Sequence, residues 1–184
     1  GSDSVGALIG LNKGPVSNCS ATITERVQAG HDYAGGLVGA SQSGITDCSA
    51  TGGSIRASYS YAGGLVGSSS GTITNCSATG NANAGNHNSG GLVGYSSNTI
   101  TNCYATGDAT LTTGSTAGGL VGYASGGTIT DCTATGSATA DDDNAGGLVG
   151  ISSSTITNCS ATGSATTRNG NCAGGLVGYN DNSC

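Results

Sequence analysis

Gly63-Gly64-Leu65-Val66-Gly67 begins a unit that continues with Thr72-Ile73-Thr74-Asn75-Cys76 and Ser77-Ala78-Thr79-Gly80 and recurs along the whole chain. The leucine of the unit returns at seven positions: Leu8, Leu37, Leu65, Leu92, Leu120, Leu148 and Leu176. Successive leucines are separated by 29, 28, 27, 28, 28 and 28 residues. A period in this range is typical of stacked structural repeats, each of which packs only against its neighbours. The sequence therefore predicts a single repeat domain that spans residues 1–184.

Each copy of the unit divides into three short arms separated by turn residues. The first arm is the GGLVG string, the second is the Thr-Ile-Thr-Asn segment, and the third runs through Ser-Ala-Thr-Gly into a second x-Ala-Thr. In Thr72-Ile73-Thr74, polar and apolar residues alternate, which favours a β-strand with one face turned inward. Helix is disfavoured because each interior Gly costs ~1 kcal/mol relative to Ala.

Three strands in every 28-residue copy predict an all-β fold, a β-solenoid (β-helix) of about six coils. Strands of a sheet lie ~4.8 Å apart, so the stack would form a rod on the order of 30 Å long. The inward residues would form one ladder each of leucine, isoleucine and alanine: Leu37, Leu65 and Leu92; Ile45, Ile73 and Ile100; Ala50, Ala78 and Ala105.

Composition excludes several classes of function. The formal net charge is −6, and the four basic residues are scattered at Lys13, Arg26, Arg56 and Arg168, whereas nucleic-acid binding needs clustered Lys and Arg. No apolar run approaches the roughly 20 residues of a membrane-spanning helix, so membrane insertion is not expected. The repeats contain no set of nucleophile, base and orienting group. We therefore expect no enzymatic activity, no catalytic residue, no cofactor and no metal site.

Eight cysteines, an even number, favour an oxidising compartment. Six of them share one phase of the repeat: Cys19, Cys48, Cys76, Cys103, Cys132 and Cys159. Equivalent Cα atoms of adjacent coils would be ~4.8 Å apart, within the ~4.4–6.8 Å that a disulfide spans. This predicts the pairs Cys19–Cys48, Cys76–Cys103 and Cys132–Cys159, with a ladder of buried free thiols as the alternative. Cys172 and Cys184 lie outside this phase and would bond to each other or to a neighbouring molecule.

The segment from Gly90 to Gly107, GGLVGYSSNTITNCYATG, resembles the GLUG repeat of microbial surface proteins. Six of the seven copies carry the GGLVG string, and the first, at residues 6–10, is degenerate. The resemblance implies an extracellular, cell-surface or cell-envelope location and adhesive or structural roles. Composition, cysteines and open ends are, more weakly, similar to those of the amyloid-like proteins that build sheaths around some methanogenic archaea.

Two outward stripes are expected from the repeat. If Leu65 points inward, its neighbour Val66 points outward in a regular strand, which predicts a lateral apolar contact stripe of Val38, Val66, Val93, Val121, Val149 and Val177. The alternative is that the glycines bend the arm and bury both residues. The second stripe is an outer threonine ladder: Thr72, Thr74, Thr99, Thr101, Thr128, Thr130, Thr155 and Thr157. Many ice-binding solenoids have such ladders.

The chain enters and leaves the repeat in the same phase, at Gly6 and Leu8 and at Gly174 and Leu176, with no capping segment. Because unpaired strands recruit further strands, these edges predict end-to-end association with copies of itself, and secondarily contacts with other cell-envelope components. The favoured function is a structural extracellular protein that polymerises into a sheath, filament or surface layer. The alternatives are an adhesin stalk or ligand-binding repeat and, third, an ice-binding protein.

Overall fold

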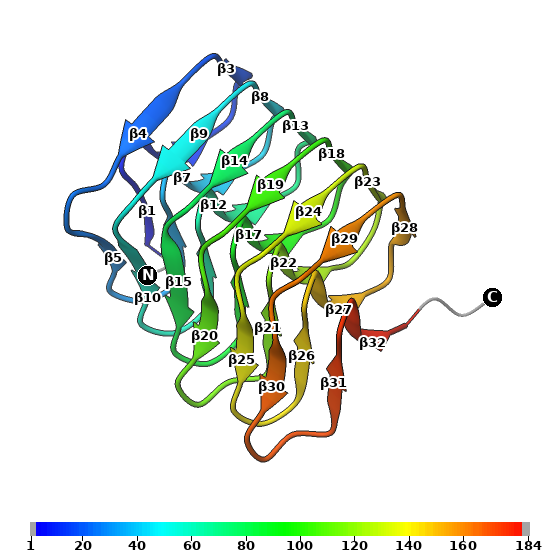
Figure 1. The fold of residues 1–184 in the computed structure, drawn as a ribbon. Coiled ribbons are helices and arrows are strands. Elements are labelled where there is room, and N and C mark those ends of the chain that lie inside the picture. The colour runs from blue at the N-terminus through cyan, green and yellow to red at the C-terminus, as the bar shows by residue number, and fades with distance from the viewer. Residues whose placement is uncertain (1–2, 182–184) are drawn as a thin grey trace.

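A computed structural model describes residues 3–181 of the chain. These residues form 32 β-strands and no helix, and the strands wind into a stack of coils with the N- and C-terminal ends at opposite ends of the stack (Figure 1). Every strand pairs in parallel with the equivalent strand of the neighbouring coil. The predicted fold class, an all-β solenoid of about six coils, is therefore confirmed.

The strands belong to five parallel sheets, which we name A to E in the order in which the chain visits them. Sheet A contains β1 (Ser4–Gly6), β6 (Tyr33–Gly35), β11 (Tyr61–Gly63), β16 (Asn88–Gly90), β21 (Thr116–Gly118), β26 (Asn144–Gly146) and β31 (Cys172–Gly174). Sheet B contains β2 (Ile9–Asn12), β7 (Val38–Ser41), β12 (Val66–Ser69), β17 (Val93–Ser96), β22 (Val121–Ala124), β27 (Val149–Ser152) and β32 (Val177–Asn180).

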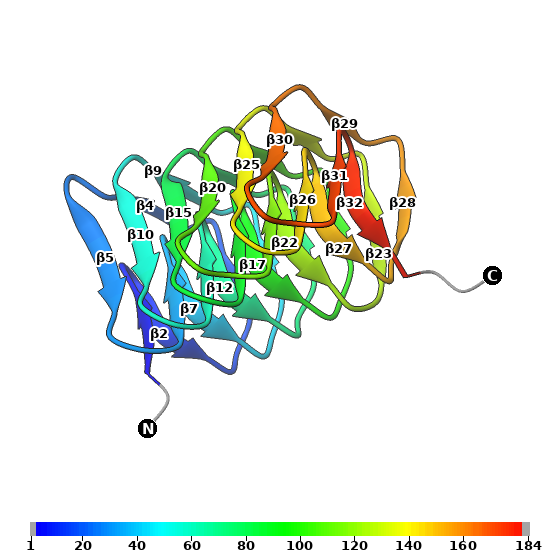
Figure 2. The same ribbon diagram turned by 90° about the horizontal axis from the view of Figure 1, so that it is seen from below.

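The remaining three sheets contain six strands each. Sheet C contains β3 (Val16–Ser17), β8 (Ile45–Thr46), β13 (Ile73–Thr74), β18 (Ile100–Thr101), β23 (Thr128–Thr130) and β28 (Thr155–Thr157). Sheet D contains β4 (Ser20–Thr22), β9 (Ser49–Thr51), β14 (Ser77–Ala78), β19 (Tyr104–Ala105), β24 (Thr133–Ala134) and β29 (Ser160–Ala161). Sheet E contains β5 (Arg26–Ala29), β10 (Ser54–Ala57), β15 (Asn81–Ala84), β20 (Ala109–Leu111), β25 (Ala138–Ala140) and β30 (Ala165–Thr167), the row labelled from the left to the upper right in Figure 2.

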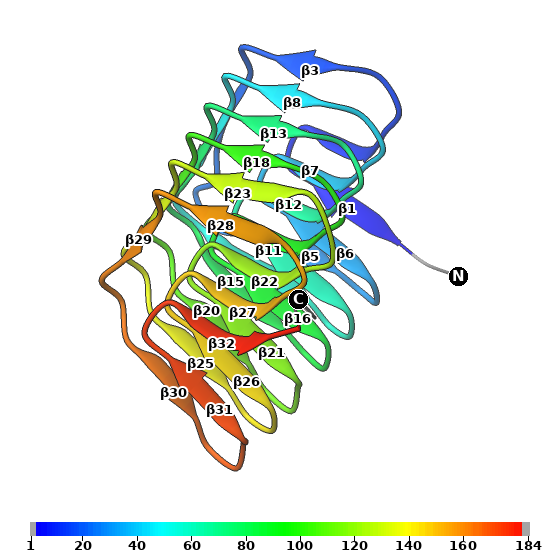
Figure 3. The ribbon, with the colours of Figure 1, turned by 90° about the vertical axis from the view of Figure 1, so that its right-hand side faces the viewer.

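Each full coil thus has five short strands, where the sequence predicted three. The GGLVG arm is interrupted between its second Gly and Leu, so that β11 ends at Gly63 and β12 begins at Val66. The third arm is likewise interrupted at the Thr-Gly pair, between β14 and β15. The reason is that the cross-section has more corners than three straight arms would give, as the view in Figure 3 shows.

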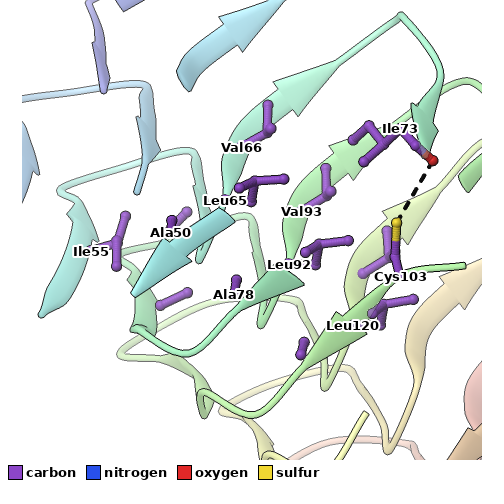
Figure 4. Close-up of a cluster of buried hydrophobic side chains, with 14 of the residues drawn as sticks. Ala50, Ile55, Leu65, Val66, Ile73, Ala78, Leu92, Val93, Cys103 and Leu120 are labelled. Atoms are coloured by element: carbon purple, nitrogen blue, oxygen red, sulfur yellow. Dashed lines mark hydrogen bonds between the residues drawn. The ribbon is translucent and has the colours of Figure 1, made fainter. Parts of the chain in front are cut away.

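The core is a set of stacked apolar ladders (Figure 4). Leu65 and Leu92, Ile73 and Ile100, and the small Ala78 are fully buried. Burial of a leucine or isoleucine side chain stabilises the fold by about 1.5–3 kcal/mol, and each coil repeats this contribution. The ladders supply a continuous core along the rod although the cross-section is narrow.

The glycines of the GGLVG string allow backbones to meet where sheets A and B join. A Cβ atom placed on Gly63 would lie 1.9 Å from the carbonyl oxygen of Val66 and 2.8 Å from the amide nitrogen of Gly94 in the next coil. A Cβ on Gly64 would lie 2.0 Å from the carbonyl oxygen of Gly91. Any side chain at these positions would overlap backbone atoms, so the double glycine is required by this corner.

We predict that Gly63→Ala destabilises the fold by about 1–3 kcal/mol or more, because overpacking against backbone cannot be relieved by a side-chain rotation. The matched control is Gly14→Ala, since a Cβ there meets no atom within 4 Å, and its stability should change by no more than ~0.5 kcal/mol. Urea denaturation followed by circular dichroism measures both. Equal stabilities of the two variants would contradict this account of the corner.

Candidate functional site

The corner between sheets C and D carries one Asn or Asp per coil with a left-handed backbone. These residues have φ between 51° and 55°: Asn18, Asp47, Asn75, Asn102, Asp131 and Asn158. Asn and Asp are the non-glycine residues that adopt this conformation most readily. Asn75 Nδ2 donates to Asp47 Oδ1 at 3.0 Å, and Asn102 Nδ2 donates to Asn75 Oδ1 at 2.8 Å. The left-handed backbone of these Asn and Asp residues, and the hydrogen bonds between their side chains, place the cysteine that follows at the same position in each coil.

The six cysteines of the shared phase repeat one hydrogen-bonding pattern. Each thiol donates to the carbonyl oxygen two residues earlier at 3.1–3.2 Å, as Cys48 does to Thr46 and Cys76 to Thr74. The backbone N–H of Cys19 donates to Cys48 Sγ at 3.4 Å, and the same contact joins Cys76 to Cys103 and Cys132 to Cys159. We call this set the cysteine ladder. Its four inner members are buried, and Cys19 and Cys159 are half-buried at its ends.

The predicted disulfide pairs are not formed, and the structure has the alternative, free thiols, at all seven cysteines that it describes. The physical reason is that every ladder thiol donates to the carbonyl oxygen two residues earlier in its own coil. This repeated bond gives neighbouring sulfurs the same orientation, and none of them is joined by the ~2.05 Å bond of a disulfide. Pairing would require one cysteine of each pair to leave this arrangement. Cys172 lies in β31, away from the ladder, and Cys184 lies outside the described residues.

Neighbouring thiols of the ladder perturb one another. Contacts of Cys103 with the sulfurs of Cys132 and Cys76, followed by burial, raise the pKa of Cys103. The contact with Cys103 lowers the pKa of Cys76 and the pKa of Cys132. Burial raises the pKa of Cys48 and of Cys159. The ladder is therefore a line of adjacent, mutually interacting sulfurs.

The predicted lateral stripe of valines is wrong. Val38, Val66, Val93, Val121 and Val149 are fully buried in the core, and Val177 is half-buried at the end of the rod. The chain bends at Gly64-Leu65, so that Leu65 ends the corner and Val66 begins a new strand whose first side chain also points inward. The five buried valines therefore form no apolar contact surface on the outside of the described rod.

The threonines of sheet C lie on its outer side. In β23, Thr128 is exposed and Thr130 is half-exposed, whereas Ile129 between them is buried. One row is continuous through the register, from Ser17 and Thr46 to Thr74, Thr101, Thr130 and Thr157. The second row contains Thr72, Thr99, Thr128 and Thr155 and begins only in the third coil, because Gly44 precedes Ile45.

The two ends of the described rod expose what its interior buries. Leu8 is 50% exposed and Leu176 is 39% exposed, whereas the equivalent Leu37 is 0% exposed. The strands that contain or flank Gly6 and Gly174, β1 and β31, each have a partner on one side only within residues 3–181. A hollow of about 420 Å³ opens at the first coil, where Val5, Ile23 and Val27 line it.

Asp3 fastens the first strand to the second coil. Its Oδ2 accepts the N–H of Gly30 at 2.7 Å, and its Oδ1 accepts the N–H groups of His31 and Asp32 at 2.9 Å. The hydrogen bond from Asp32, together with those from Gly30 and His31, lowers the pKa of Asp3 below 3.8 against a smaller opposing effect of burial. The carboxylate form of Asp3 therefore holds β1 in place.

Sequence reasoning missed a row of aromatic rings along the outside of sheets A and B. Tyr33 stacks on Tyr61 with ring centroids 5.6 Å apart, Tyr61 contacts Tyr95 at 5.7 Å, and Tyr95 contacts Tyr123 at 5.6 Å. Tyr33 and Tyr95 also line a groove of about 370 Å³. The signal was present in the sequence, since Tyr33 and Tyr61 both precede Ala-Gly-Gly, and Tyr95 and Tyr123 both follow Leu-Val-Gly.

A family model, described as the GLUG motif, matches residues 30–56, 58–83, 85–112, 113–139 and 143–166. The chain belongs to the GLUG-motif family. Its five matches cover the central coils, so the GLUG repeat corresponds to one coil of the solenoid. A search of curated proteins finds no match.

A similar solved structure carries the description "Crystal structure of a putative immunoglobulin A1 protease from Bacteroides ovatus". The TM-score is 0.66 at 16% identity, and the alignment covers 91% of this GLUG-repeat chain and 66% of that chain. At this identity the likeness supports the β-solenoid fold alone. Across residues 3–181 there is no helix long and apolar enough to cross a membrane, and no three His, Cys, Asp or Glu side chains converge on a common point.

We predict that all six ladder cysteines of the purified chain are alkylated by iodoacetamide after unfolding without reduction. In the native chain, Cys19 and Cys159 should react first because they are half-buried, and Cys48, Cys76, Cys103 and Cys132 should be protected. Peptide mass spectrometry measures the modification at each site. Recovery of disulfide-linked ladder peptides would contradict the free-thiol arrangement.

We also predict that acid releases the first strand. A carboxylate whose folded pKa is depressed contributes stability above its unfolded pKa, near 3.8, and this contribution is lost as the pH falls through the lower folded pKa. Amide protection at Gly30, His31 and Asp32 should therefore fall below pH 3.8, measured by hydrogen exchange and corrected for the intrinsic rate. Asp3→Asn should show the low protection at every pH. Equal protection of the parent chain on both sides of this pH would contradict the role of Asp3.

Proposed function

We propose that this GLUG-repeat β-solenoid is a structural, extracellular protein that associates end to end into a cell-envelope polymer. It acts without enzymatic chemistry and without a cofactor, and its partner is a further copy of itself. The observation that carries the proposal is the contrast between Leu8 and Leu176, which are 50% and 39% exposed, and Leu37, which is fully buried at the same phase. Full burial of a leucine is worth about 1.5–3 kcal/mol, so covering one of these partly exposed leucines is worth roughly half of that, about 1 kcal/mol.

Parallel in-register pairing supports a specific junction. Strands β31 and β32 of one copy would pair with β1 and β2 of the next, so that sheets A and B continue across the contact. Both ends present unpaired backbone N–H and C=O groups of this kind within residues 3–181, and such edges favour addition of another strand. The resulting filament would have the stacked strand arrangement of cross-β assemblies.

The ends are stepped, because sheets A and B have seven strands whereas sheets C, D and E have six. In the proposed junction, two sheets continue, and the other three face each other across one unfilled strand layer. The contact is therefore weaker than a coil-to-coil contact inside the rod, and association should depend on protein concentration.

A second candidate is a ligand-binding repeat of a surface protein, such as an adhesin stalk. The specific observation in its favour is the groove that Tyr33 and Tyr95 line, together with the row of tyrosines that continues to Tyr123. The four rings are half-buried, and the Tyr95 hydroxyl forms a hydrogen bond with Ser125 Oγ at 2.8 Å. An ice-binding role remains a third candidate on the two threonine rows of sheet C alone.

The assembly proposal is tested by a double variant, Leu8→Lys with Leu176→Lys. Each introduced lysine would place a charge against the apolar end strands of the neighbouring copy. This variant should therefore be monomeric at concentrations where the parent chain forms filaments. Light scattering and electron microscopy measure the difference. Tyr104→Lys is the matched control, since Tyr104 is 42% exposed on the side of the rod, and its assembly should equal that of the parent.

Deletion of residues 1–12 removes β1 and β2 and makes the two ends complementary in all five sheets. This variant should assemble at lower concentration than the parent. A parent chain that stays monomeric at every concentration, or a Leu8/Leu176 variant that assembles as well as the parent, would refute the proposal.

A further inference from the structure

The tyrosine row changes from one sheet to another along the rod. Tyr33 and Tyr61 pair in register in sheet A, whereas Tyr95 lies in sheet B. In the second and third coils, the sheet B positions that correspond to Tyr95 are the small residues Ala40 and Ser68. The groove of about 370 Å³ lies over these two residues. It is open because the ring of each of these coils lies on sheet A, and the side chain on sheet B is small.

Larger side chains bound the groove at its two ends along the rod. The corresponding sheet B position is Leu11 in the first coil and Tyr95 in the fourth. Three strand spacings of ~4.8 Å separate them, so their Cα atoms are about 14 Å apart. Tyr95 is held in place, since its hydroxyl bonds to Ser125 Oγ at 2.8 Å and its ring contacts Tyr61. The groove is therefore short and has a fixed aromatic end, and we call it the sheet B slot.

Tyr33 presents an aromatic ring that is covered by a second ring on one side only. It stacks on Tyr61, with the ring centroids 5.6 Å apart and the planes inclined by 16°. On the opposite side, its register partner in the first coil is Ser4, which is too small to cover a ring. Tyr33, Ser4 and Leu11 all line the slot. One side of the Tyr33 ring is therefore available as an apolar surface for a ligand.

Hydrogen-bonding groups without a protein partner lie around this apolar surface. The hydroxyls of Tyr33 and Ser68 and the amide of Gln42 line the slot and form no hydrogen bond with another described residue. Hydroxyl and amide groups can each both donate and accept. Among the described residues that line the slot there is no Asp, Glu, Lys, Arg or His. The lining therefore suits an uncharged ligand that has an apolar face and a rim of donor and acceptor groups.

We propose that the sheet B slot binds a short neutral oligosaccharide. The C–H face of one sugar ring lies against Tyr33 and Leu11, and the sugar hydroxyls bond to Gln42 and Ser68. An apolar surface with a few placed polar groups is the usual construction of a ligand site. The proposal rests on the second candidate function, ligand binding, and not on association of the ends.

A proline-rich peptide is the other ligand that docks on aromatic rings. Its prolines lack the backbone N–H and supply carbonyl acceptors alone. Such a peptide would use the Tyr33 and Ser68 hydroxyls only as donors and would leave the carbonyl oxygen of the Gln42 amide without a donor. The slot therefore favours the sugar, and the peptide serves as a competing probe in the test.

The test is saturation-transfer NMR on the full chain, with the tyrosine ring protons irradiated. Because the chain has no Phe and no Trp, aromatic saturation begins almost entirely at tyrosines. The neutral probes are cellotetraose, chitotetraose and maltotetraose, and the comparison probes are acidic tetragalacturonate and decaproline. We expect transfer to at least one neutral oligosaccharide and none to the two comparison probes.

Three substitutions locate the binding in the slot. Ser68→Leu places a branched side chain where the ligand would lie, so affinity should fall roughly tenfold or more. Gln42→Ala removes one exposed hydrogen-bonding group, so affinity should fall roughly three- to tenfold. Ser77→Leu is the matched control, because Ser77 is a half-buried serine of the same coil on sheet D, and its affinity should equal that of the parent. Circular dichroism should show that all three variants keep the strand content of the parent.

No transfer to any of the three neutral oligosaccharides at millimolar concentration would overturn the proposal. Equal affinities of Ser68→Leu and Ser77→Leu, or binding of decaproline in place of the sugars, would overturn it as well. The variant with Leu8→Lys and Leu176→Lys should bind the sugar as the parent does, since the slot lies over the second and third coils. Loss of binding confined to that variant would place the sugar at the rod ends and refute the slot, whereas loss of filaments alone concerns only the assembly proposal.

Discussion

The backbone hydrogen bonds between equivalent positions of adjacent coils are the interaction on which the whole structure depends. They set a single translation, about 4.8 Å, and every side chain inherits it. Leu65 therefore lies on Leu92, Ile73 on Ile100, and Ala78 on Ala105. A residue type succeeds at a given phase only if it can pack against its own copy at that distance.

This constraint explains the composition. Like charges placed opposite each other in a sheet are destabilising, so a repeated charged residue cannot form a ladder, and only 8% of the residues are charged. The two acids of the left-handed corner show how the rule is met. Asp47 lies beside Asn75, whose amide donates to it, and Asp131 is flanked along the corner by Asn102 and Asn158. Amides, hydroxyls, aromatic rings and thiols, in contrast, all tolerate stacking on their own kind.

The repeat period predicted the fold because stacking equivalent positions of adjacent coils requires the same residue types to recur at a fixed interval in the sequence. The conformation within one coil is different, since it depends on corners that local patterns describe poorly. Period-two alternation correctly placed Ile73 inside and Thr74 outside. It failed at Leu65 and Val66, because the bend that buries both is imposed by Gly63 and Gly64 approaching backbone atoms of the neighbouring strand and coil. The sequence pattern did not predict the tyrosine row, because its members come from two different sheets. Tyr61 and Tyr95 become neighbours only when the chain folds into its cross-section.

The same translation makes the ends of the described rod chemically different from its middle. An inner leucine, thiol or strand edge is covered by its own copy above and below, whereas a terminal one is covered on one side only. Leu8, Cys19 and β1 are exposed or half-exposed for this single reason, although their sequences match buried equivalents. The proposed association at the ends rests on this same cause. In a stack of repeats, each inner residue is covered by its copies in the two neighbouring coils. The end layers of the described rod lack one of these copies, so they expose residues that the interior buries.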